Sequence, residues 1–218
     1  MMLRSLMIAL LCLAAVAVAE AQKNTPKNTP KTGRKAAPAC CNPQEAAAFS
    51  DKSLYQTEAV WRDFNGKSVK LSDYTGKIVI TTMIFTTCRY ACPQITADMR
   101  RISDQLPPAV RRAAQFVFIT MDVERDLPAV LRAYADSMGI RDENWTFLHG
   151  SDADAREIAA LLGINYKKMS DGSFSHSNVI VVLNQGGEIA CRQTGLKTDP
   201  APTVACIGKL AAPRAKKR

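Results

Sequence analysis

The chain has 218 residues, of which 47% are hydrophobic and 22% are charged. This balance is typical of a folded protein and excludes a chain that is disordered throughout. At this length one compact domain can bury a sufficient core without help from disulfides, so we expect one domain. We also expect the protein to act as a monomer.

The net charge of +9 suggests a nucleic-acid partner until its location is considered. Residues 36–212 contain 19 basic and 19 acidic side chains, whereas residues 1–35 and 213–218 hold ten basic side chains and only Glu20 as an acid. The body predicted to fold is therefore neutral. Because a duplex-binding domain concentrates basic residues on one folded face, we expect no nucleic-acid partner. Basic tails of this kind are expected to be solvated and to favour anionic surfaces such as membranes.

Residues 1–21 follow the plan of a secretory signal. Arg4 precedes an uncharged stretch, residues 6–19, whose small final residues suit cleavage after Ala19 or Ala21. The apolar run is shorter than the roughly 20 residues that cross a bilayer, although an uncleaved signal would still serve as an anchor. We therefore predict an exported protein, periplasmic or membrane-associated and facing the periplasm. Cleavage would remove Cys12 and leave six cysteines in an oxidising compartment.

Residues 22–39 are expected to form a flexible linker. They contain the sequence KNTPKNTPKTGRK, which repeats a Lys-Asn-Thr-Pro unit and offers no apolar side chain to bury. The folded domain is predicted to span residues 40–212, and residues 213–218 form a short basic tail.

Hydrophobic patterning predicts the elements of this domain in order. Residues 54–61 and 68–71 should form a hairpin around the Asn65-Gly66 turn signal. Residues 78–85 and 116–121 are expected to be buried strands, each followed by a helix, at residues 93–106 and 127–138. A short strand at 145–148 and a helix at 152–162 should precede two strands, at 178–183 and 188–191, and a helix that begins after Asp199-Pro200.

Alternation of buried strands with helices predicts the α/β class. A terminal antiparallel pair followed by a helix is how thioredoxin-like domains end. We therefore expect a thioredoxin-like fold, with an N-terminal β-hairpin and a central, mostly parallel sheet flanked by helices.

Two cysteines, Cys88 and Cys92, lie four residues apart in the sequence CRYACP, where a buried strand is predicted to meet a helix. Side chains four apart share one helical face, with Cβ atoms about 5–6 Å apart, so the pair can share a metal or form a disulfide. The positive end of the helix and the charge of Arg89 both favour thiolate over thiol. A buried, purely structural pair is the alternative, but the strand-to-helix corner favours a reactive pair.

His176 lies in a polar segment, residues 171–178, which we expect to be a loop that leads into the strand at 178–183. In a thioredoxin-like sheet the start of this strand approaches the N-terminus of the first helix, so His176 should lie within reach of the thiols. The alternative is an exposed histidine bonded to its serine neighbours. We interpret His149 as a structural or surface residue.

Two thiolates and one neutral imidazole form a soft set of three ligands that suits Cu(I) and accommodates Cu(II). Structural zinc normally requires a fourth protein ligand. A zinc site would therefore need either Asp171 or one of the remaining cysteines, which are Cys40, Cys41, Cys191 and Cys206. Those cysteines could instead form one or two disulfides. Cys191 with Cys206 is the favoured pairing because their predicted strand and helix are neighbours.

Taken together, several short motifs resemble the Sco/SenC family of copper proteins, which take part in cytochrome c oxidase assembly. They run in order over about residues 53–210. The motifs are SLYQ at 53–56 with Trp61, FNGK at 64–67, LSD at 71–73, GK at 76–77, FTTC at 85–88 with Cys92-Pro93, MDVERD at 121–126 with Pro128, and His176 before its strand.

This resemblance implies a thioredoxin-like protein that carries copper on Cys88, Cys92 and His176. It also implies that the protein either delivers copper to the dinuclear centre of an oxidase subunit or keeps the thiols of that subunit reduced. The implied partners are a copper-accepting oxidase subunit and a copper donor protein.

Two residues depart from the pattern of the family. Arg89 stands where many members have proline after the first cysteine, and Ser175 precedes His176 where many have aspartate. The second difference removes a carboxylate that could orient the imidazole. We therefore expect the copper affinity to be weaker or differently tuned.

A thiol–disulfide oxidoreductase is the competing interpretation, with Cys88 attacking a partner disulfide and Cys92 resolving the mixed disulfide. Thioredoxin-type reductases use Cys-x-x-Cys and, by family resemblance, have a cis-proline where this chain has Ser-His-Ser-Asn. The sequence therefore favours a metallochaperone. A peroxidase of the same fold is a weaker alternative, because such enzymes use a differently placed cysteine.

Overall fold

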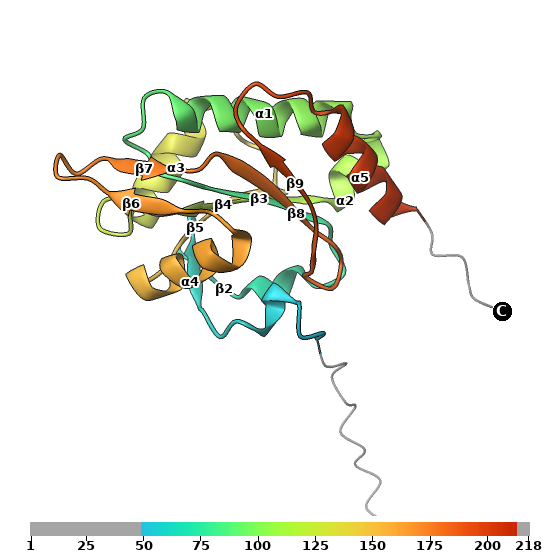
Figure 1. Cartoon of the computed structure of the whole chain (residues 1–218), viewed down its shortest axis with the longest axis horizontal. Helices are drawn as coiled ribbons and strands as arrows, with labels where there is room; N and C mark the ends of the chain where they lie inside the picture. Colours follow the sequence, from blue (N-terminus) through green and yellow to red (C-terminus); the bar gives the residue numbers. More distant parts are fainter. Residues whose placement is uncertain (1–48, 213–218) are drawn as a thin grey trace, which may run out of the picture. The chain divides into compact units, whose positions relative to one another are not determined.

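Residues 49–212 are described by a computed structural model of the chain (Figure 1). The predicted signal (1–21), linker (22–39) and basic tail (213–218) lie outside the described residues, as do Cys12, Cys40 and Cys41. Of the predicted folded domain, residues 40–48 also lie outside them.

The described part of the chain contains nine strands, five α-helices and two short 3-10 helices. In chain order they are η1 (Leu54–Gln56), β1 (Trp61–Asp63), β2 (Ser68–Val69), η2 (Leu71–Tyr74), β3 (Val79–Ile84), α1 (Ala91–Gln105), α2 (Pro108–Ala113), β4 (Gln115–Thr120), α3 (Pro128–Ser137), β5 (Trp145–His149), α4 (Asp152–Leu162), β6 (Tyr166–Lys168), β7 (Phe174–His176), β8 (Val179–Leu183), β9 (Ile189–Thr194) and α5 (Ala201–Ala211).

Seven strands form one mixed sheet in the order β2-β1-β5-β4-β3-β8-β9. The central strands β3, β4 and β5 are parallel, whereas β1, β8 and β9 pair with their neighbours in antiparallel fashion. The predicted α/β sheet is therefore present, and its parallel part is limited to three strands. Because these three strands point the same way, the segments that follow them, including the one that bears Cys88, leave at one edge of the sheet.

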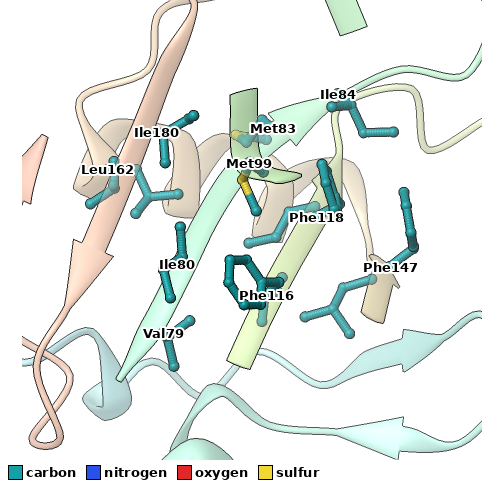
Figure 2. Close-up of a cluster of buried hydrophobic side chains, with 14 of the residues drawn as sticks. Val79, Ile80, Met83, Ile84, Met99, Phe116, Phe118, Phe147, Leu162 and Ile180 are labelled. Atoms are coloured by element: carbon teal, nitrogen blue, oxygen red, sulfur yellow. The ribbon is translucent and has the colours of Figure 1, made fainter. Parts of the chain in front are cut away.

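The hydrophobic core lies on both faces of β3 and β4, whose residues are all buried. Figure 2 shows Ile80 and Met83 of β3 with Phe116 and Phe118 of β4 and Met99 of α1. Successive side chains of a strand point to opposite faces. A strand buried throughout must therefore be covered on both sides, which explains the unbroken β-branched run in the sequence.

Helices supply this cover on the two sides of the sheet. In Figure 1, α1 lies above the strands and α4 lies below them. Val117 and Ile119 of β4 line a small cavity together with Ile158 and Leu162 of α4. On the α1 side, Arg100 donates a hydrogen bond to the carbonyl of Met138, just after α3. This contact helps to hold α1 in place, and with it the first helical turn that carries Cys92.

The N-terminal hairpin differs from its prediction. The hairpin consists of β1 and β2 alone. Residues 54–56, which were predicted to be strand, form η1. The Ser53 hydroxyl accepts a hydrogen bond from the Tyr55 backbone N–H at 3.1 Å, and a serine that bonds to nearby backbone competes with strand pairing. The Leu54 N–H donates instead to the Gly187 carbonyl at 3.0 Å, far along the chain.

Four further elements were not predicted: the 3-10 helix η2, the short helix α2, and the pair β6 and β7, which forms a separate two-stranded sheet. The other predicted strands and helices are present within a few residues of their expected bounds. Within residues 49–212, no helix combines the length and the apolar character needed to cross a membrane.

Candidate metal and thiol site

Cys88 lies in the turn between β3 and α1, just before the helix begins at Ala91. The N-cap residue, Tyr90, offers no side-chain hydrogen bond to the first helical N–H groups. The Cys88 sulfur takes this place, because the Cys92 backbone N–H donates to Cys88 Sγ at 3.3 Å. The prediction that both cysteines share a helical face was therefore wrong in detail, since only Cys92 lies in α1.

Cys92 is fully buried in the first turn of α1, whereas Cys88 is half-buried. The Phe85 backbone N–H donates to Cys92 Sγ at 3.4 Å, which ties the helix to the end of β3. Cys88 and Cys92 are the free cysteines of the described residues.

Hydrogen bonds make the two thiols unequal. The Cys92 thiol and the backbone N–H groups of Cys92, Tyr90 and Ala91 donate to the Cys88 sulfur and lower its pKa from 9.0 to about 5, although partial burial opposes this. The same hydrogen bond and burial raise the pKa of the Cys92 thiol far above its usual range. Cys88 is therefore a thiolate at neutral pH, and Cys92 holds its proton. Arg89, expected to favour the thiolate, is exposed, and the shift comes from hydrogen bonds instead.

His176 ends strand β7, in a segment that was predicted to be a loop. Its neighbour across the small sheet is Tyr166, and its ring meets the Phe85 ring edge-on with centroids 5.8 Å apart. His176 Nδ1 lies 3.2 Å from the Ser177 carbonyl oxygen. A carbonyl can only accept a hydrogen bond, so in the neutral ring Nδ1 carries the hydrogen and Nε2 carries the lone pair.

The contact between His176 and the Ser177 carbonyl takes the place of a contact with an aspartate at position 175. The sequence predicted that Ser175 deprives the imidazole of an orienting carboxylate, and Ser175 is indeed exposed. The backbone carbonyl of Ser177 fixes the tautomer in its place, as backbone carbonyls commonly do for metal-binding histidines.

The structure brings the three residues together. One ligand atom from each of Cys88, Cys92 and His176 lies within 4.8 Å of the other two. Such a group can hold a small ion at bonding distance after minor adjustment, and its two sulfurs and one nitrogen are soft donors.

The described residues add no fourth ligand to this group. The Asp171 carboxylate is engaged with Ser173, whose hydroxyl donates to it at 2.6 Å. Cys191 and Cys206 form a disulfide with each other, which confirms the favoured pairing and removes them as ligands. Among described residues the arrangement therefore fits three-coordinate copper better than structural zinc.

The MDVERD motif at 121–126 forms a further element of the site. Residues 121–126, here called the connector loop, join β4 to α3. The Asp126 carboxylate accepts hydrogen bonds from the backbone N–H of Thr86 at 3.0 Å and from the Thr86 hydroxyl, two residues before Cys88. The connector loop also contains the carbonyl of Val123, which accepts from His149 Nε2 at 3.0 Å, consistent with a structural His149. A buried aspartate four residues after another, following a buried strand, is the sequence signal for this element.

A cavity among the described residues lies elsewhere. It measures about 470 Å³ and is lined in part by Gln115 and Trp145, the first residues of the parallel strands β4 and β5. The cysteines follow the opposite ends of the parallel strands. Cys88, Cys92 and His176 do not line this cavity, so it is not part of the site.

Comparison with known proteins places these features in a family. The sequence profile of the SCO1/SenC family matches residues 51–212. A SCO1 protein homolog of Bacillus subtilis is 25% identical over 156 residues, which cover 70% of this chain and 80% of that protein.

Solved structures share the fold. A SCO1/SenC family lipoprotein of Bacillus anthracis is 22% identical, covers 76% of this chain and 100% of its own, and has a TM-score of 0.66. ScoI of Bradyrhizobium japonicum, solved with copper bound, is 23% identical, covers 70% of this chain and 96% of its own, and has a TM-score of 0.56. These likenesses confirm the predicted thioredoxin-like fold.

Proposed function

The chain belongs to the SCO1/SenC family, and on that basis we propose that it is a metallochaperone that carries one copper ion on Cys88, Cys92 and His176. The observation that carries this proposal is the convergence of two sulfurs and one imidazole nitrogen within 4.8 Å of one another. These residues come from two separate parts of the fold: the β3–α1 turn with the first turn of α1, and strand β7.

The electrostatics of the site suit Cu(I). Thiolate is the form of cysteine that binds metal, and Cys88 is already a thiolate at neutral pH because its pKa is lowered to about 5. Binding must still displace the proton of Cys92, whose pKa is raised. Copper uptake therefore releases about one proton per ion near neutral pH, which makes the affinity rise with pH.

The acceptor that the family resemblance implies is a copper-binding subunit of cytochrome c oxidase, supplied in turn by a copper donor protein. A carrier with three protein ligands leaves a coordination position at which an incoming sulfur or imidazole can bind before the first ligands leave. We propose that the protein acts after export, in the periplasm or attached to the membrane that faces it, and the relative named as a lipoprotein supports export.

Copper titration of three variants tests the ligand set. In the reduced protein we expect one Cu(I) per chain, and we expect Cys88→Ala or Cys92→Ala to abolish binding in competition with a Cu(I) chelator. His176→Ala should weaken binding by more than about 100-fold, beyond the effect typical of residues that only support ligands, and should remove the thiolate-to-Cu(II) absorption band.

Two controls separate the site from the other cysteines. A Cys191→Ser/Cys206→Ser variant removes the disulfide and should bind copper as the parent does. A Cys40→Ser/Cys41→Ser variant shows whether that pair also binds copper. Unchanged stoichiometry and affinity in all three ligand variants would refute the assignment.

A second function, thiol–disulfide exchange, is favoured by the unequal pair of thiols. The Cys88 thiolate would attack one sulfur of a partner disulfide, and the other partner sulfur would leave as a thiolate. Cys92 would then lose its proton and attack Cys88, releasing the second partner thiolate. Two electrons pass to the partner, and the resulting Cys88–Cys92 disulfide must be reduced by another dithiol. Catalytic reduction of a model disulfide, with His176→Ala as active as the parent, would favour this function over copper transfer.

A further inference from the structure

The site has two halves, the cysteine turn that leads into α1 and the β6–β7 hairpin that bears His176. The connector loop, residues 121–126, joins these halves and is itself firmly held. The Met121 backbone N–H donates to the Ile84 carbonyl at 2.9 Å, at the end of β3. The Val123 carbonyl accepts from His149 at 3.0 Å, at the end of β5. The loop is thereby tied to two strands of the central sheet and can serve as a fixed support for its neighbours.

On one side the connector loop contacts the cysteine turn. Asp126 is fully buried and accepts from the backbone and hydroxyl of Thr86, and also from the Thr120 hydroxyl at 2.6 Å. Burial raises the pKa of the Asp126 carboxyl, and the hydrogen bonds from Thr120 and Thr86 oppose that rise. The turn that leads to Cys88 is therefore attached to the loop by directed bonds in a dry environment.

On the other side the connector loop contacts the hairpin that bears His176. Arg125 Nε donates to the buried Asp122 carboxylate at 2.5 Å, within the loop. The Nη2 group of the same Arg125 donates to the Gly172 carbonyl, in the turn between β6 and β7. Gly172 adopts a positive φ of 76°, which glycine tolerates without strain, so this turn presents its carbonyl without steric cost.

The β6–β7 hairpin depends on contacts with neighbouring segments because it is not part of the main sheet. An isolated two-stranded hairpin is marginally stable at best in water. Other attachments include the rings of Phe174 and His176, which pack on Phe85 with centroids 5.3 Å and 5.8 Å apart. The Arg156 guanidinium also lies over the Tyr166 ring, and Lys168 forms an ion pair with Glu124. That ion pair is largely exposed, with side chains 42% and 72% accessible, and exposed pairs contribute little. Arg125, whose side chain is 43% accessible, forms a link of a different kind, because one guanidinium bonds both the buried Asp122 carboxylate and the Gly172 carbonyl.

We propose that Arg125 is a positioning residue for copper, which holds the β6–β7 hairpin so that His176 stays over the two sulfurs. This inference rests on the proposed function, because it concerns the same three ligands. Metal–nitrogen bonds tolerate only small deviations in length, so a hairpin that moves away removes the imidazole from the ligand set without unfolding the protein.

The test compares Arg125→Gln with Arg132→Gln as a matched control. Arg132 is also a partly exposed arginine that donates to a side chain, Asn65, but it lines the distant cavity and contacts no residue of the site. We expect Arg125→Gln to lower Cu(I) affinity by about 10-fold to 100-fold, as is typical for residues that orient ligands. Arg132→Gln should bind copper as the parent does.

Three further measurements exclude a general loss of stability. In the Cu(II) form, electron paramagnetic resonance of Arg125→Gln should show weaker or absent nitrogen coupling while the thiolate absorption remains. In the metal-free form, hydrogen exchange should be faster in β6 and β7 only, and the pH profile of Cys88 alkylation should stay unchanged. Arg125→Lys keeps the charge but cannot reach both acceptors with one planar group, so it should restore only part of the affinity.

The outcomes separate the two claims. If the parent binds copper through a nitrogen ligand and Arg125→Gln matches it in affinity and nitrogen coupling, the positioning role is wrong and the proposed function stands. If the parent itself shows no nitrogen coupling and no affinity loss in His176→Ala, the proposed ligand set fails and the positioning role fails with it.

Discussion

The two halves of the site are built in opposite ways. The cysteine half lies between a fully buried central strand and the longest helix of the described residues, with Cys92 completely shielded. The histidine half lies on a three-residue strand of a separate sheet, where His176 is half-buried. The core therefore positions the sulfurs, whereas a few contacts between surface segments position the imidazole.

Phe85 is the residue at which the two halves meet. It is 5% exposed, follows β3, and contacts the rings of both Phe174 and His176. Its backbone N–H also donates to the Cys92 sulfur. A change at Phe85 should therefore act on both halves, whereas changes farther out should act on one of them.

The largest effect is expected for Phe85→Ala. Removing a buried aromatic ring costs about 3–5 kcal/mol, so the free energy of unfolding should fall by that amount in urea denaturation. Hydrogen exchange should increase in the hairpin as well as near Cys92. Faster hydrogen exchange in only one half of the site would show that Phe85 supports that half alone.

The next effect is expected for the disulfide between Cys191 and Cys206, which links β9 to α5. It closes a loop of 15 residues, and a loop of that length is worth about 3 kcal/mol. Cys191→Ser/Cys206→Ser should lose about this much unfolding free energy and leave Cys88 alkylation unchanged. A shift in Cys88 reactivity would show that the body of the fold, beyond the two halves, also sets the site.

The pH dependence of Cys88 isolates the cysteine half. With its pKa lowered from 9.0 to about 5, alkylation of the reduced protein by iodoacetamide should reach half of its maximum near pH 5. At pH 7 this means about 100-fold more thiolate than in an ordinary cysteine. His176→Ala should not move the profile. A midpoint above pH 8 would contradict the hydrogen-bonded thiolate.

The same shift affects stability. Because the pKa of Cys88 is lower in the folded state than its ordinary 9.0, its contribution to stability is absent below about pH 5 and grows as the pH rises toward 9. Reduced parent protein should therefore gain unfolding free energy over Cys88→Ser between pH 5 and pH 8. Equal pH dependence in both proteins would contradict the assignment.

The smallest global effect is expected for Phe174→Ala. Phe174 is half-buried and packs on Phe85 from the hairpin, so the unfolding free energy should fall by only about 1 kcal/mol. Hydrogen exchange in β6 and β7 should nevertheless increase strongly, because local opening needs less energy than global unfolding. A loss as large as that of Phe85→Ala would show that the hairpin belongs to the core after all.

The same contrast explains what the sequence could predict. The cysteine half follows from local patterns, because a β-branched run, two cysteines and a proline in the first helical turn lie within sixteen residues of one another (78–93). The capping role of the Cys88 sulfur was missed, since it depends on where α1 begins. Helix ends fray, and a hydrophobic pattern does not fix the first residue of a helix to within one or two positions.

The hairpin was missed for a different reason. Its strands are three residues long and only partly buried, so hydrophobic alternation is too short to detect. The Asp171-Gly172 pair between them was a usable signal, because Asp-Gly is a preferred hairpin turn. The contact from Arg125 to Gly172 spans 47 residues, and no local pattern predicts a contact of that range.

The two sulfurs differ in solvent exposure, and this difference decides which of them a reagent can reach. Cys92 has no contact with solvent, and Cys88 is partly open to it. Of the two sulfurs, only that of Cys88 can therefore be reached from solvent without movement of the chain. A soluble thiol reagent should for this reason modify Cys88 and spare Cys92 as long as the protein stays folded.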